Sequence, residues 1–168
     1  YNTVYYEYPT TPEAATAETE LLRWPHASQS VDLPRLELNR AEKLFAARRW
    51  ADARKAYGIV RSNGAPDAKA VAELRIAQCD FHLARYAAAR DGLRVILQRP
   101  GTPGVDAGYY WLGTLRGLKS PEYVGAVNRF VAANPTHPRA EAALNDLATH
   151  YILADDDKTA AEVFTRQY

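Results

Sequence analysis

A six-residue phrase occurs twice in this chain, once near each end. Residues 9–14 read Pro-Thr-Thr-Pro-Glu-Ala, and residues 135–140 read Pro-Thr-His-Pro-Arg-Ala. Each copy follows an aromatic helical run and precedes a run rich in alanine and leucine. A proline-containing junction that returns between helical patterns is typical of helical-hairpin arrays, in which each unit buries its apolar face by stacking on its neighbours. The sequence therefore predicts a repeat architecture.

The middle of the chain repeats with the spacing of a helical hairpin. Trp50 and Ala53 return 36 residues later as Tyr86 and Ala89. Small residues let two helices approach closely and large ones interdigitate between them, so we predict an all-α fold, a right-handed α-solenoid of helical hairpins. The predicted packing positions are Ala41, Phe45, Trp50, Ala53, Tyr57, Ala77, Phe81, Tyr86, Ala89, Leu93, Tyr123, Ala126, Phe130, Ala160 and Phe164.

Proline and glycine divide the chain into helices. Proline cannot donate its backbone amide and biases the preceding residue away from the helix, so residues 62–66, 100–104 and 134–138 end helices. Ser120 and Asp157 are candidate N-caps. Shorter turns are expected at residues 48–49, 84–85, 119–121 and 155–157. The predicted helices span residues 12–23, 34–47, 51–61, 68–83, 87–98, 105–118, 121–133, 138–153 and 157–168, and no strand is expected.

We expect these helices to form one array over residues 1–168. It comprises the end of a truncated repeat and the next helix (1–23), an irregular connection (24–33), three repeats (34–66, 67–103 and 104–137) and an open-ended last hairpin (138–168). The chain lacks Met and both opens and closes inside a helix. We therefore expect a removed leader or a longer parent protein, with further units or a partner covering the ends of the array.

Aromatic residues near the ends of the chain and at the irregular connection form the candidate partner surface. They are Tyr1, Tyr5, Tyr8, Trp24 and Tyr168. Irregular connections carry binding residues more often than regular turns do. Two alternatives stay open: the connection is a plain linker, and the tyrosines pack in the core, as aromatic residues do in helical repeats.

Composition excludes several classes of function. The chain has 21 basic and 20 acidic residues, so it has no large single-sign field and we predict no nucleic-acid partner. No apolar stretch approaches the roughly 20 residues that span a bilayer, so no membrane span is expected. Cys79 is the only cysteine in the sequence and is interpreted as a small buried apolar residue.

No motif for catalysis or cofactor binding stands out. The glycines around residue 104 lack the lysine of a phosphate-binding loop, and the four histidines do not pair at metal-binding spacing. Asp155–Asp157 is interpreted as a solvated acidic turn at a helix N-terminus. No glutamate stands in a local setting that marks a general acid of raised pKa. We predict no catalytic residue, no metal and no cofactor.

The spacing of Trp50, Ala53 and Tyr57 resembles that of tetratricopeptide repeats in degenerate form. Val4–Pro9 and two longer stretches, residues 38–50 and 143–151, look like the superhelical region of bacterial soluble lytic transglycosylases. That resemblance implies a periplasmic or extracellular protein whose helices precede a lysozyme-like domain that cleaves peptidoglycan. The Glu-Ser pair and the Gly-Leu-Met-Gln-like run of that domain are absent here, so no catalytic residue is carried over.

Three functions follow as hypotheses. The first is the non-catalytic superhelical part of a lytic transglycosylase, which positions glycan strands or its own catalytic domain; a lysozyme-like domain after Tyr168 would select it. The second is a non-enzymatic tetratricopeptide adaptor whose exposed tyrosine and arginine side chains hold a protein or peptide partner. The third is a solenoid that associates head to tail with further copies of itself into filaments.

Overall fold

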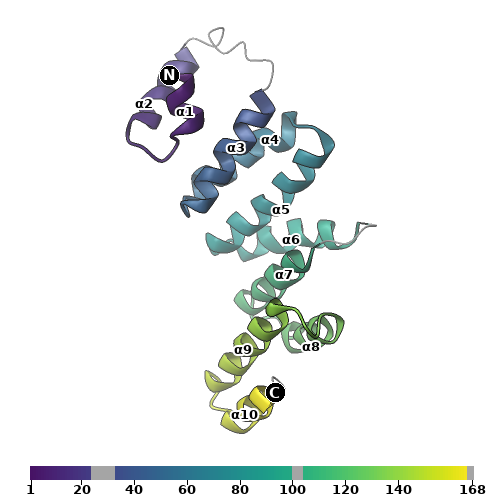
Figure 1. Cartoon of the computed structure of the whole chain (residues 1–168). Coiled ribbons are helices and arrows are strands. Elements are labelled where there is room, and N and C mark those ends of the chain that lie inside the picture. Colours follow the sequence, from purple (N-terminus) through teal and green to yellow (C-terminus); the bar gives the residue numbers. More distant parts are fainter. Residues whose placement is uncertain (24–32, 100–103, 166–168) are drawn as a thin grey trace. The chain divides into compact units, whose positions relative to one another are not determined.

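The computed structural model describes residues 1–23, 33–99 and 104–165 (Figure 1). These residues form helices and turns without a strand, which confirms the predicted all-α class. The helices are α1 (Asn2–Glu7), α2 (Glu13–Arg23), α3 (Leu33–Ala46), α4 (Trp50–Asn63), α5 (Pro66–His82), α6 (Tyr86–Leu97), α7 (Val105–Gly117), α8 (Tyr123–Ala133), α9 (Pro138–Ile152) and α10 (Asp157–Thr165).

The chain divides into two compact units, Tyr1–Gly92 and Leu93–Tyr168, with the division inside α6. In the first unit, α4 packs against α3 and α5, and α1 packs against α2 and α3. In the second unit, α9 packs against α7, α8 and α10. Each of these contacts joins helices that are no more than two elements apart in the sequence. The packing is compatible with a helical repeat.

Alanine is prominent at the helix contacts of both cores. Its small side chain allows the backbones of neighbouring helices to approach closely, and the larger residues fill the remaining space. The first core contains Ala41, Leu44, Ala53, Ala56, Tyr57, Val60, Ala72, Ile76 and Cys79. The second contains Leu112, Leu115, Tyr123, Ala126, Val127, Ala143, Leu144, Leu147, Ala148 and Val163.

Four turns share one backbone conformation. Arg48, Ala84, Lys119 and Asp155 have φ of 58°, 56°, 51° and 56°. After each of them, the amide of the next residue donates to the carbonyl five positions earlier, at 2.8 to 3.0 Å. This is the Schellman arrangement that ends a helix, and it normally uses glycine at the left-handed position. The turns lie where the sequence predicted them.

Two proline-containing junctions also have similar backbone conformations. We call Pro9–Pro12 the first junction and Pro135–Pro138 the second junction. Tyr8, before the first junction, has φ −123° and ψ 50°, and Asn134, before the second, has φ −135° and ψ 49°. The repeated phrase therefore specifies a repeated local structure.

The helix ends differ from the prediction in a few places. Leu33 belongs to α3 and not to the irregular connection, whose residues 24–32 lie outside the described part of the chain. The helix expected from residue 121 begins at Tyr123, because Pro121 and Glu122 form a turn. The cap of α10 is Asp156 and not Asp157, since its Oδ1 accepts from the amide of Thr159 at 3.1 Å.

Candidate functional site

A groove of about 520 Å³ lies in the first unit, between α1, α2, α3 and α4. Its apolar lining consists of Leu21, Leu22, Leu33, Pro34 and Ile59. Its polar lining consists of Tyr5, Tyr6, Glu18, Glu37, Lys55 and Asn63. Leu22 is 75% exposed and Ile59 is 40% exposed, so part of this apolar surface is open to solvent. A concave apolar surface with a few polar groups is the usual form of a binding site.

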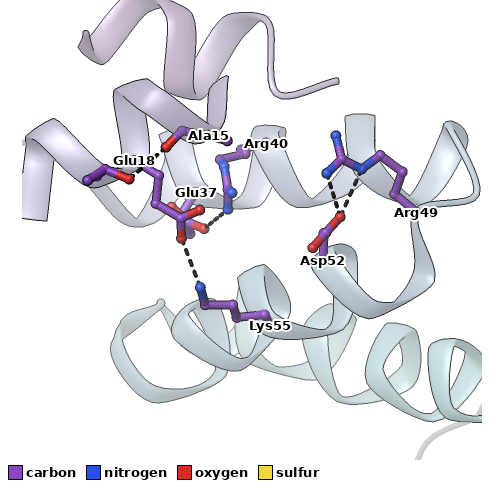
Figure 2. Close-up of polar contacts among 8 residues, drawn as sticks. Ala15, Glu18, Glu37, Arg40, Arg49, Asp52 and Lys55 are labelled. Atoms are coloured by element: carbon purple, nitrogen blue, oxygen red, sulfur yellow. Dashed lines mark hydrogen bonds and ion pairs between the residues drawn. The ribbon is translucent and has the colours of Figure 1, made fainter. Parts of the chain in front are cut away.

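A buried ion pair forms part of the groove. Arg40 Nη1 donates to Glu37 Oε1 at 2.9 Å, and the two side chains are 9% and 5% exposed (Figure 2). The Arg40 guanidinium also lies over the Tyr5 ring, 3.9 Å from its centre. Removing one partner of such a pair would leave a buried charge without compensation, which typically costs about 3–5 kcal/mol. Both residues of the pair belong to α3, and the contact of Arg40 with the Tyr5 ring connects the pair to α1.

The pKa of the Glu37 carboxyl is raised above its ordinary value, chiefly because burial disfavours the charged form. The charge of Arg40 and its hydrogen bond oppose this rise in the pKa, and the nearby Glu18 carboxylate adds to it. Glu37 is thus a buried acid of raised pKa, which the sequence analysis did not predict.

A second ion pair stands at the groove. Lys55 Nζ of α4 contacts Glu18 Oε1 of α2 at 2.8 Å (Figure 2). Glu18 is one-third exposed and Lys55 is largely exposed, so solvent weakens this pair. Both carboxylates of the groove are therefore matched by cations of the chain. The groove presents apolar surface with balanced charge, which suits an uncharged or amphipathic ligand better than a strongly charged one.

Two tyrosines complete the groove. Tyr5 and Tyr6 pack edge to face, with ring centres 4.8 Å apart. Burial raises the pKa of Tyr5 to about 12 and also raises the pKa of Tyr6. Both phenols therefore stay protonated near neutral pH and can donate hydrogen bonds.

The predicted partner-surface residues lie in different environments. Tyr1 and Tyr8 are 68% and 59% exposed. Tyr5 is 9% exposed and lies beneath Arg40, so it belongs to the packed side of the groove. Trp24 and Tyr168 lie outside the described residues.

The predicted packing positions are mostly enclosed. Those that are buried are Ala41, Ala53, Tyr57, Ala77, Ala89, Leu93, Tyr123, Ala126 and Ala160. Those that are half-buried are Phe45, Trp50, Phe81, Tyr86 and Phe130. Phe164 differs: it is exposed, while Val163 is buried, because the face of α10 that is buried carries Ala160 and Val163, three residues apart.

Glu37 is the residue that sequence reasoning missed. It stands four and seven residues before Ala41 and Leu44, both buried in α3. Residues at these spacings share one face of a helix. That periodicity was a usable signal that Glu37 faces the interior.

Outside the groove, polar side chains connect helices within each unit. Asp146 of α9 accepts from Arg116 Nη1 at 2.7 Å and from the Tyr109 hydroxyl at 3.1 Å, which links α9 to α7. In the first unit, Arg54 donates to the buried Asp80 at 2.6 Å. These contacts fix helix positions and leave the groove as the candidate site.

Residues 1–23, 33–99 and 104–165 were searched for clusters of metal-ligating side chains and for membrane-spanning helices. No group of three or more metal-ligating side chains occurs in these ranges. No helix within them is long and apolar enough to cross a bilayer.

The fold is all-α and compatible with a helical repeat, and its first unit carries an apolar groove. In comparisons with family models, curated proteins and solved structures, nothing matches this chain. The resemblance to lytic transglycosylases therefore stands on the three sequence stretches alone.

Proposed function

We propose that this chain is a non-enzymatic helical scaffold whose groove between α1 and α4 holds an amphipathic segment of a protein partner. The observation that carries the proposal is the open apolar wall of a groove whose two carboxylates are already paired. An amphipathic segment can bury apolar side chains against this wall without leaving a buried carboxylate unpaired. The tyrosine hydroxyls then supply hydrogen bonds that orient the segment.

The test replaces apolar surface inside and outside the groove with the same charge. Leu22→Asp places a carboxylate on the open wall, whereas Val71→Asp does so at an exposed position of α5 that does not line the groove. Partners are isolated with the unaltered chain from its source cells, and their affinities are measured after purification. Leu22→Asp should weaken binding at least tenfold and Val71→Asp should leave it unchanged. Equal affinities for all three chains would refute the groove as the site.

A second candidate is the superhelical region of a periplasmic lytic transglycosylase. Its support is the resemblance of Val4–Pro9, Leu38–Trp50 and Ala143–Tyr151, which supply core residues such as Leu44 and Leu147. The likeness therefore concerns packing and the scaffold role, and gives these residues no chemistry. Sedimentation of the chain with purified peptidoglycan distinguishes the candidates: retention that Leu22→Asp abolishes favours glycan, and no retention removes this candidate.

A further inference from the structure

The two units contain equivalent sets of three helices, α3–α5 and α7–α9. In each set, the first and the third helix are followed by a left-handed turn residue, Arg48 and Ala84 in the first unit and Lys119 and Asp155 in the second. Both residues of the second pair follow their counterparts by 71 positions. The same offset relates buried residues of the two sets: Ala41, Leu44, Ala72 and Ile76 in the first, and Leu112, Leu115, Ala143 and Leu147 in the second. The two sets can therefore be compared position by position.

Three rings pack together where these helices end in the first unit. Phe45 of α3 and Trp50 of α4 pack edge to face, with ring centres 5.0 Å apart. The His82 ring of α5 stacks on Trp50, with ring centres 4.1 Å apart and an angle of 11° between the planes. The Arg75 guanidinium covers Phe45, 4.4 Å from the ring centre. Flat rings therefore occupy this end of the first unit.

The second unit differs at all three ring positions. The replacements are Arg116 for Phe45, Tyr123 for Trp50 and Leu153 for His82. Arg116 pairs with Asp146 at 2.7 Å and Leu153 is 82% exposed, so these side chains do not rebuild the ring cluster. A pocket of about 470 Å³ lies there instead, between the α7–α8 turn, the start of α8 and the end of α9. Every position in this comparison is described in both units, so the difference lies in the replacements themselves.

The lining of this pocket contains basic side chains and no carboxylate. The basic side chains are those of Arg116, Lys119 and His150. Lys119 is exposed, and no ion pair joins it to another described residue. Ser120 Oγ accepts from the amide of Glu122 at 3.3 Å, so its hydroxyl proton can still be donated to a ligand. The rest of the lining is largely apolar, which suits an anion with an apolar body.

We propose that this pocket binds a small aromatic carboxylate. The ligand ring takes the place that the stacked rings of Trp50 and His82 occupy in the first unit, and its carboxylate pairs with Lys119. The His150 ring, whose centre is 5.3 Å from that of Tyr123, supplies an aromatic contact. The pocket volume falls in the range of about 300–1,000 Å³ that is usual for small-molecule sites. The site belongs to the second unit and does not depend on the function proposed for the groove.

The probes are indole-3-acetate and indole-3-acetamide, which share a ring system and differ in charge. Titrated into the isotope-labelled full chain, the acetate should shift the amide signals of Lys119 and Ser120 saturably, with a dissociation constant of about 1 mM or lower. The acetamide should bind about threefold to fivefold more weakly, because it forms no ion pair. Equal affinities for the two probes would show that the pocket does not recognise the charge and would overturn the proposal.

Three variants of the full chain locate the contact. Lys119→Gln should weaken binding of the acetate about threefold to fivefold and leave binding of the acetamide unchanged. Lys158→Gln makes the same change at an exposed position of α10 outside the lining and should alter neither affinity. Leu153→Trp places an indole ring on the pocket wall, as in the first unit, and should weaken both probes at least tenfold. The side chain of Leu153 is largely exposed, so this substitution removes little packing.

Several outcomes contradict the proposal. Equal affinity of Lys119→Gln and Lys158→Gln for the acetate excludes the ion pair, and unchanged binding by Leu153→Trp excludes the pocket. Absence of saturable shifts with the acetate excludes the ligand class. Saturable shifts at Tyr6 and Leu22 alone would assign the probe to the groove. Shifts at Ser120 that grow with chain concentration without any probe would mean that a second copy of the chain covers the pocket.

Discussion

The same substitution, alanine to glycine, should stabilise this protein at one exposed position and destabilise it at another. Ala84 has φ 56° in the turn between α5 and α6 and is exposed, so its methyl group contributes little packing. Ala70 is exposed inside α5 and has ordinary helical geometry. The two sites differ in backbone conformation and lie in the same unit.

The magnitude follows from two opposing terms. A left-handed conformation costs an L-residue about 1–2 kcal/mol, and glycine removes that cost. Glycine also makes the unfolded chain more flexible, which costs about 0.4–1 kcal/mol. Ala84→Gly should therefore raise the free energy of unfolding by about 0.5–1 kcal/mol. Ala70→Gly has no strain to relieve and should lower it by about 1 kcal/mol.

Urea denaturation followed by circular dichroism measures both variants against the unaltered chain. The gap between them should be about 1.5–2 kcal/mol. Equal destabilisation by both substitutions would show that Ala84 is not strained in solution, and the account of the four turns would then fail.

Three further predictions concern the cores and the groove. Leu44→Ala should lower the free energy of unfolding by about 2–5 kcal/mol in urea denaturation, because the side chain is fully buried, whereas Leu22→Ala on the open groove wall should change it by less than about 0.5 kcal/mol. Burial raises the pKa of the Cys79 thiol to about 12, so a thiol reagent at pH 8 should modify it only when urea unfolds the chain; rapid reaction of the folded chain would contradict this. Burial raises the pKa of the Glu37 carboxyl, so the folded state keeps this proton to a higher pH than the unfolded state does. The free energy of unfolding of the chain, relative to that of Glu37→Gln, should therefore fall as pH rises above about 4.3, the ordinary pKa of glutamate. A relative stability that increases with pH would refute the burial of this carboxyl.

The helices and their turns were predictable because the information that sets them is local. Arg48 and Ala84 follow apolar helical runs, and they adopt the left-handed turn although neither is glycine. Hydrophobic periodicity and breaker residues within a window of one hairpin therefore suffice to place these turns. The repeated proline phrase similarly specifies two junctions of equal backbone conformation.

The groove was not predictable in this way, because its polar centre depends on contacts between helices distant in sequence. Glu37 is buried where α1 packs on α3, and Arg40 reaches the ring of Tyr5, which lies 35 residues earlier. The spacing of Glu37 with Ala41 and Leu44 marks this face of α3 as an interior one, but no local pattern says that α1 is the helix that covers it. The sequence analysis placed the N-cap of α10 at Asp157, whereas the structure has it at Asp156, and this difference has another cause. Adjacent aspartates have the same propensity to cap a helix, and the geometry of the turn selects between them.

The pairing of each helix with helices at most two elements away has a kinetic consequence. Contacts between near neighbours close short loops, so this chain should fold in the microsecond-to-millisecond range of helical proteins with low contact order. It also means that duplication or deletion of a whole hairpin breaks few distant contacts in the described units. The length of such a chain can therefore change in evolution by whole hairpins, while the turns and junctions that remain keep their local structure.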